Sequence, residues 1–78
     1  FMEVADSYVP LFPQIMKLSD RDINAIKNIL DTARKKNDFN LAFMAGEKIK
    51  SHLKIDSPMS PFEFLDTLLR DYNFLSTK

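Results

Sequence analysis

Few residues of this 78-residue chain are suited to catalysis, because it contains one histidine and no cysteine. His52 and Asp56 are four residues apart, a spacing that places two side chains on one face of a helix and suits a divalent metal. Two ligands do not make a metal site, and Pro58 indicates that the helix ends near this point. We therefore interpret His52 as a surface residue near a helix terminus and expect no metal.

The acidic residues near the C-terminus offer no catalytic arrangement either. Glu63, Asp66, Arg70 and Asp71 have the spacing of the solvated face of a helix. The lack of cysteine excludes thiol chemistry and disulfides, and a single glycine excludes a glycine-rich phosphate-binding loop. The sequence predicts a protein that is not an enzyme and that uses no cofactor and no small-molecule substrate.

The charges balance in total but not along the chain. Eleven basic and eleven acidic residues give a net charge of zero, whereas residues 34–54 carry six basic and two acidic residues. The basic residues of this stretch are Arg34, Lys35, Lys36, Lys48, Lys50 and Lys54. Such a stretch suits phosphate groups, although lysines are also common on solvated helix faces. A small DNA- or RNA-binding transcriptional regulator using the middle helix is therefore the alternative function.

Residues 38–56 allow two interpretations. Ala45 and Gly46 have the small side chains found at the turn of a helix-turn-helix motif. Ile49 and Leu53, however, continue one apolar stripe, so a single continuous helix fits better. Gly46 in mid-helix then costs about 1 kcal/mol relative to alanine, and we expect close approach of another backbone to offset that cost.

The chain carries more large apolar side chains than three short helices readily bury. It contains seven phenylalanines, two tyrosines and four methionines. Those without an obvious place in the core are Phe43, Met44, Phe64 and Phe74. Surplus aromatic and methionine surface is typical of protein interfaces, unless the N-terminal arm covers it. These four residues are the predicted protein-binding surface, for another protein or for self-association as a homodimer.

Capping signals delimit the first two helices. Ser19 with Asp22 three residues on forms a capping box that begins a helix over about 20–36. Its apolar stripe comprises Ile23, Ile26, Leu30 and Ala33. Asn37 suits the left-handed residue that ends a helix, and Asp38 is a new N-cap. A second helix over about 39–54 therefore forms a helical hairpin with the first.

The last helix follows a loop over residues 54–60. Ser60, Pro61 and Glu63 have the types preferred at the cap, the first and the third positions of a helix. They predict a third helix over about 61–74, with an apolar stripe along it.

The first eighteen residues are expected to form an irregular arm. Pro10 and Pro13 disfavour a long helix, although one short helical turn can start at Pro13. The apolar side chains of this arm predict that it packs across the helices. Phe1 precedes Met2. We interpret Phe1 as a vector-derived remnant and Met2 as the native start.

The sequence thus predicts an all-α protein, with an arm over residues 1–18 and a small three-helix bundle over residues 19–78. No apolar run approaches the roughly 20 residues of a membrane span, and no signal segment opens the chain. We expect a cytoplasmic or otherwise intracellular protein without a membrane partner. The predicted function is non-catalytic protein binding or regulation through helix faces.

Overall fold

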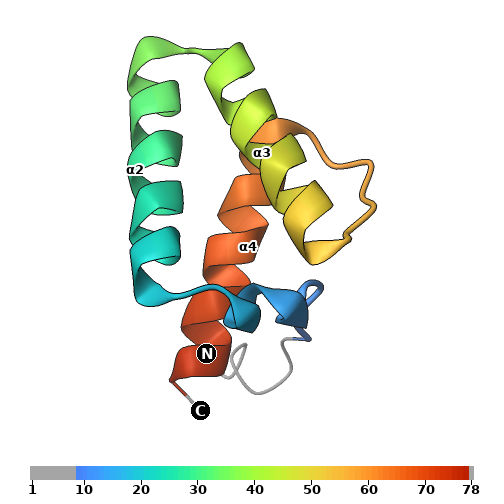
Figure 1. The fold of residues 1–78 in the computed structure, drawn as a ribbon. Helices are drawn as coiled ribbons and strands as arrows, with labels where there is room; N and C mark the ends of the chain where they lie inside the picture. The colour runs from blue at the N-terminus through green and yellow to red at the C-terminus, as the bar shows by residue number, and fades with distance from the viewer. Residues whose placement is uncertain (1–8, 78) are drawn as a thin grey trace, which may run out of the picture.

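The computed structural model describes residues 9–77, which form a small all-α fold (Figure 1). A short 3₁₀ helix, η1 (Pro13–Lys17), precedes three α-helices: α2 (Asp20–Lys36), α3 (Phe39–Leu53) and α4 (Pro61–Ser76). No strand occurs among residues 9–77. The predicted all-α class, with three helices and a single short turn in the arm, is confirmed.

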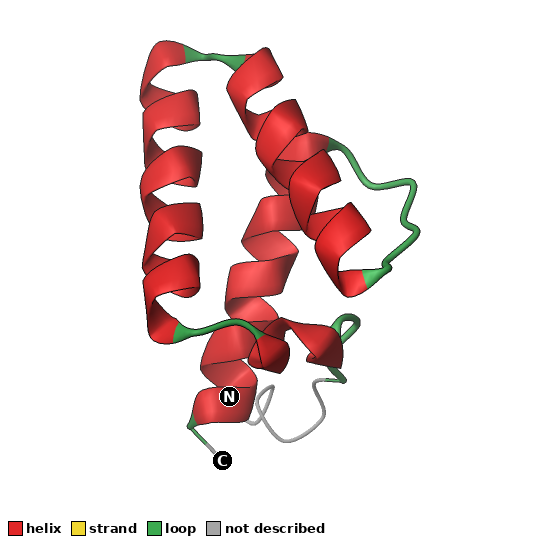
Figure 2. Ribbon diagram, in the orientation of Figure 1, coloured by secondary structure: helices red, strands yellow, loops and turns green. Residues whose placement is uncertain are grey.

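Helices α2 and α3 form the expected hairpin, and local capping explains its bounds. The Ser19 hydroxyl accepts a hydrogen bond from the Asp22 amide, and the Asp22 carboxyl group accepts one from the Ser19 amide. Asn37 ends α2 in the left-handed conformation, with φ of 53°. Asp38 begins α3 by accepting a hydrogen bond from the Leu41 amide at 3.1 Å. Only two residues therefore separate the two helices (Figure 2).

Helix α4 runs behind the hairpin and contacts both of its helices (Figure 1). It begins at Pro61 as predicted, but the Ser60 side chain makes no capping hydrogen bond. The Ser60 carbonyl accepts from the Phe64 amide at 2.8 Å, so Pro61, which needs no amide partner, sets this start. Helix α4 extends two residues beyond the predicted end, and α3 stops one residue short of its own because Lys54 is left-handed.

The core lies where α4, the hairpin and the N-terminal arm meet. Phe12 of the arm packs edge to face against Phe64 of α4, with ring centroids 5.2 Å apart. The buried apolar residues are Phe12, Ile15, Ile23, Ile26, Leu30, Ala33, Ala42, Ile49, Leu53, Ile55, Phe64, Leu65 and Leu68. Phe12 and Ile15 thus pack against the helices as predicted, whereas Val9, Leu11 and Met16 of the same arm are exposed. Residues 1–8 of the predicted arm, Phe1 among them, lie outside the described residues.

Gly46 faces a side chain rather than a backbone. A β-carbon at this position would lie 3.5 Å from Cδ2 of Phe64, an ordinary van der Waals distance. The expectation of close approach by another backbone is therefore wrong. The ring of Phe64 packs beside Gly46 and leaves space for a methyl group there.

None of the helices within residues 9–77 is long and apolar enough to cross a membrane.

Candidate protein-binding surfaces

Helix α3 exposes three large apolar side chains near its beginning. Phe39, Phe43 and Met44 are 54%, 46% and 68% exposed. The rings of Phe39 and Phe43 stack one helical turn apart, with centroids 6.3 Å apart. We call these three residues the α3 aromatic patch. Large apolar side chains at this exposure are the residues that gain most from burial in an interface.

A pocket of about 160 Å³ lies beside the two rings. Phe39, Phe43 and Gly46 line it from α3, and Met59 and Pro61 line it from the loop and the start of α4. A cavity of about 150 Å³ holds one benzene-sized group, so this pocket accepts a single large apolar side chain.

Lys50 borders this pocket and is held in place. Its Nζ donates to the Ser57 carbonyl at 3.0 Å and lies 3.5 Å from Glu47 Oε2. The same ammonium group lies 5.1 Å from the centroid of the Phe64 ring, within the range of a cation–π contact. These contacts connect α3 to the loop before α4 and fix one edge of the pocket.

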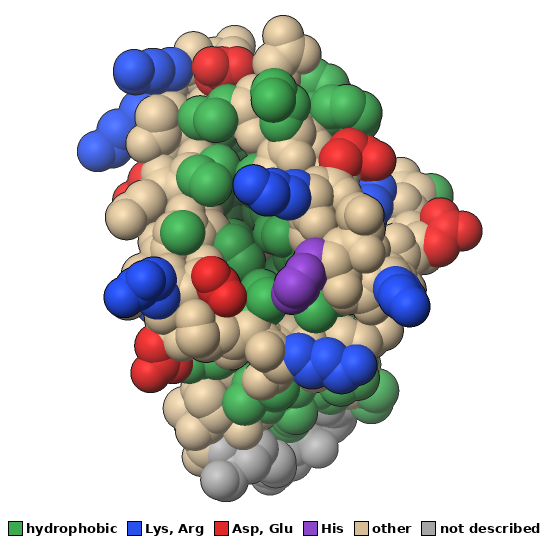
Figure 3. Space-filling view, viewed as in Figure 1, with side chains coloured by type: hydrophobic (Ala, Val, Ile, Leu, Met, Phe, Trp, Pro, Cys, Tyr) green, Lys and Arg blue, Asp and Glu red, His purple; other side chains and the backbone are tan. Residues whose placement is uncertain are grey.

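A second apolar surface lies on the opposite flank of α3. It is a groove of about 340 Å³ between α2 and α3, and we call it the α2–α3 groove. Figure 3 shows hydrophobic side chains at the bottom of this hollow and charged side chains along its edges. The apolar lining comprises Leu18, Ala25, Ile26, Ile29, Ala45 and Ile49.

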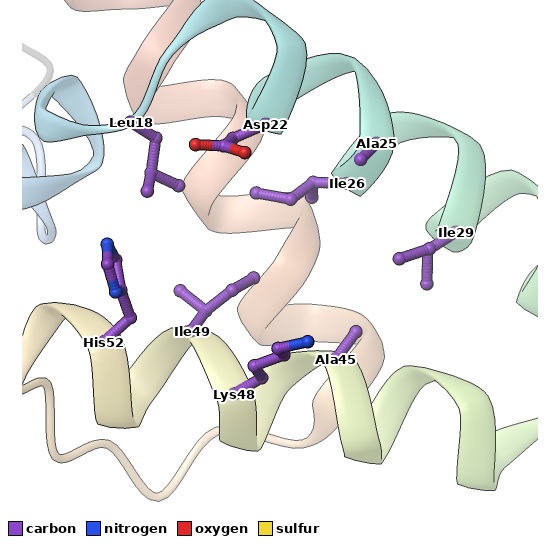
Figure 4. A pocket seen from close by; sticks show the side chains of 9 residues that line it. All are labelled: Leu18, Asp22, Ala25, Ile26, Ile29, Ala45, Lys48, Ile49 and His52. Atoms are coloured by element: carbon purple, nitrogen blue, oxygen red, sulfur yellow. The ribbon is translucent and has the colours of Figure 1, made fainter.

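The edges of the α2–α3 groove carry opposite charges. Asp22 lies on the α2 edge, whereas Lys48 and His52 lie on the α3 edge (Figure 4). Along the groove, Asp22 lies between the positions of His52 and Lys48. The groove therefore has an apolar floor, an acidic side and a side with a basic residue.

The whole chain, residues 1–78, matches the sequence family described as Domain of unknown function (DUF8484). The chain belongs to this family. No curated protein and no solved structure matches the chain.

The four residues predicted to bind protein in this DUF8484 chain have different environments. Phe43 and Met44 lie in the α3 aromatic patch. Phe39, the third residue of the patch, was not among the four predicted residues. Phe64 is fully buried, so its assignment to a binding surface is wrong. Its ring packs beside Gly46 of α3 and against Phe12 of the arm. Phe74 is half-buried near the end of α4.

The predicted basic residues do not gather on one face. Arg34, Lys35 and Lys36 lie at the end of α2, beside the start of α3, whereas Lys54 follows the end of α3. Lys48 lines the α2–α3 groove, and Lys50 lines the pocket on the other flank. Arg34 additionally lies 3.3 Å from Asp66 of α4 in an exposed ion pair. A nucleic-acid surface formed by all six residues receives no support from this arrangement.

The helix-turn-helix interpretation of residues 38–56 is also excluded. Helix α3 continues through Gly46 without a turn, and the only positive φ angles among residues 9–77 belong to Asn37 and Lys54. Residues 39–53 are therefore one helix, as the apolar stripe indicated.

The residues weighed for catalysis remain dispersed. His52 is exposed one residue before α3 ends, and Asp56 lies beyond that end. No three histidine, cysteine or acidic side chains within residues 9–77 come together as a metal would require. Asp66 bridges Arg34 and Arg70 on the surface.

Asp71 corrects the interpretation of α4 as carrying only solvated acidic residues. It is fully buried, and its Oδ2 accepts hydrogen bonds from the amides of Leu11 and Phe12. One signal for this was present in the sequence. Asp71 follows Phe64 and Leu68 at the spacing of the apolar stripe, and so lies on its buried side.

Proposed function

We propose that this chain is a non-catalytic protein-binding module whose contact surface is the α3 aromatic patch. The observation that carries the proposal is the stacked pair of exposed rings, Phe39 and Phe43, beside a pocket large enough for one apolar side chain. Interfaces gain most of their free energy from a few such anchors packed into pockets. The fixed position of Lys50 supports it, because a preformed edge lowers the entropy cost of binding.

The chemistry of this surface defines the partner. The pocket suits a peptide segment or helix that inserts one leucine- or phenylalanine-sized side chain, while Phe39 and Phe43 cover the neighbouring apolar atoms. Glu47 and Lys50 at the border accept polar groups flanking that side chain. The partner is thus a protein segment with a single apolar anchor between polar residues.

A selection from a phage-displayed random peptide library tests this proposal. Peptides selected on the wild-type chain are expected to share one large apolar residue and to bind the variant Phe43→Ser at least about tenfold more weakly. Met16→Ser is the matched control, because Met16 is a similarly exposed apolar residue outside the patch. Selected peptides that bind Phe43→Ser as tightly as the wild type, or that lose affinity for Met16→Ser instead, would overturn the proposal.

A further inference from the structure

The α2–α3 groove is a second apolar surface that the proposed function does not use. It lies on the flank of α3 opposite Phe39 and Phe43, and its lining includes the incompletely buried residues Leu18, Ile29 and Ala45. A groove between two antiparallel helices matches the apolar stripe of a further helix, or of two helices that complete a four-helix arrangement. The charged side chains along the edges of the groove indicate which of these two occupants fits.

We infer that the occupant of the α2–α3 groove is the same groove of a second copy of this chain. The observation that carries this is self-complementary charge, with Asp22 on one edge and Lys48 on the other (Figure 4). A two-fold axis along the groove places α2 of each copy over α3 of the other. Asp22 of one copy then lies above the interval between Lys48 and His52 of the second copy. The symmetry repeats the same contact, so both acidic groups face basic ones.

The alternative two-fold arrangement is disfavoured by the same charges. An axis running across the groove places α3 over α3, which brings Lys48 of one copy toward α3 of the other, with its own Lys48, and Asp22 toward the other Asp22. Like charges facing one another oppose such a contact. With the axis along the groove, each helix instead has antiparallel neighbours on both sides, as in an up-down-up-down four-helix bundle.

The size of the face sets the strength of this dimer. Helix α3 has 15 residues, and at 1.5 Å per residue and about 10 Å per helix the two helices present a face of roughly 22 Å by 20 Å. Such a face buries roughly 900 Å² over both copies, below the roughly 1,200–2,000 Å² of stable specific interfaces, so the dimer is expected to be weak and readily reversible. The α3 aromatic patch remains uncovered on the other flank of each α3, so the dimer would present two copies of it.

Sedimentation equilibrium of charge-reversed variants tests the inference. Asp22→Lys and Lys48→Glu each place like charges across the proposed contact, so each is expected to dimerise at least about tenfold more weakly than the wild type. An equimolar mixture of the two variants restores both opposite-charge contacts and is expected to form a heterodimer near wild-type strength. Circular dichroism melts establish that both variants fold, since Asp22 also takes part in the capping box.

A second pair of variants keeps the test independent of that capping box. Ile29→Glu places a charge in the groove lining and is expected to abolish dimerisation, whereas Phe43→Glu on the opposite flank leaves it unchanged. A wild-type chain that stays monomeric up to roughly 0.5 mM overturns the inference and assigns the groove to a different molecule. A dimer insensitive to Ile29→Glu, or a mixture that does not recover, also overturns it. Peptide binding at Phe43 is measured separately, so failure of the dimer leaves the proposed function standing.

Discussion

The Oδ2 atom of Asp71 lies 2.8 Å from the backbone nitrogen of Phe12 and accepts its hydrogen bond. The same oxygen accepts a second hydrogen bond, from the Leu11 amide at 3.0 Å. One buried side chain of α4 therefore satisfies two amides of the arm and places the Phe12 ring against Phe64. The arm is attached to the helices by this polar contact as well as by apolar packing.

Replacing Asp71 should destabilise the fold far more than replacing a surface acid of the same helix. Asp71→Ala leaves two amides without their acceptor and is expected to lower the free energy of unfolding by about 2–3 kcal/mol. Asp66→Ala removes only exposed ion pairs and is expected to cost less than about 1 kcal/mol. Urea denaturation of both variants measures the difference. Equal losses would contradict the role of Asp71.

Replacing a phenylalanine of the core should destabilise the fold far more than replacing one of the α3 aromatic patch. Phe64→Ala removes a fully buried ring and is expected to cost about 3–5 kcal/mol. Phe43→Ala truncates a 46% exposed ring and is expected to change the free energy of unfolding by less than about 1 kcal/mol. Thermal or urea unfolding, followed by circular dichroism, gives both values. A large loss for Phe43→Ala would mean that this residue serves the fold rather than binding.

Gly46 should tolerate alanine but not leucine. The β-carbon of Gly46→Ala would lie 3.5 Å from the Phe64 ring, and alanine favours the helix by about 1 kcal/mol, so this variant is expected to be neutral or more stable. Gly46→Leu must displace that ring and is expected to lose about 1–3 kcal/mol. Midpoints of urea unfolding compare the two variants. A strongly destabilised Gly46→Ala would show that the contact is tighter than described.

Tyr72 should titrate above a free tyrosine. Its hydroxyl donates a 2.6 Å hydrogen bond to Asp20 Oδ1. This bond, with partial burial and the negative charge of Asp20, raises the pKa of Tyr72 above 10.0. Because the pKa is raised in the folded state, the contribution to stability is complete below the unfolded pKa of about 10 and is lost as the pH rises through the folded pKa.

Alkaline absorbance titrations of the wild type and Tyr72→Phe isolate this group. The difference between the two curves is expected to have its midpoint above pH 10, and the stability difference between the two proteins is expected to disappear at higher pH. A midpoint at or below 10 would contradict the hydrogen bond to Asp20.

The helices could be predicted from the sequence because their signals are local. The reciprocal bonds of Ser19 and Asp22, the left-handed Asn37 and the cap at Asp38 depend only on residues within one helical turn. The spacing of apolar residues also predicted which faces of α2 and α3 pack against the core. These features need no knowledge of the neighbouring helices.

Spacing places Phe64 and Asp71 on one side of α4, but it could not predict which groups they meet there. Both lie on the side of α4 that the N-terminal arm covers, and the arm's position depends on contacts between residues about 50 to 60 positions apart. Of the four residues predicted to bind protein, Phe43 and Met44 are exposed, and their binding role stays a prediction. The α2–α3 groove was not foreseen, since it follows from the separation of two helices.

Site-specific photocrosslinking tests the central claim, protein binding through the α3 aromatic patch, most directly. A benzoylphenylalanine placed at Phe43 in cells that naturally contain this protein should give a discrete adduct with one different protein, identified by mass spectrometry. The same probe at Ser51, an exposed polar position of α3, should give none. No adduct from Phe43, or the same adducts from both positions, would contradict the account.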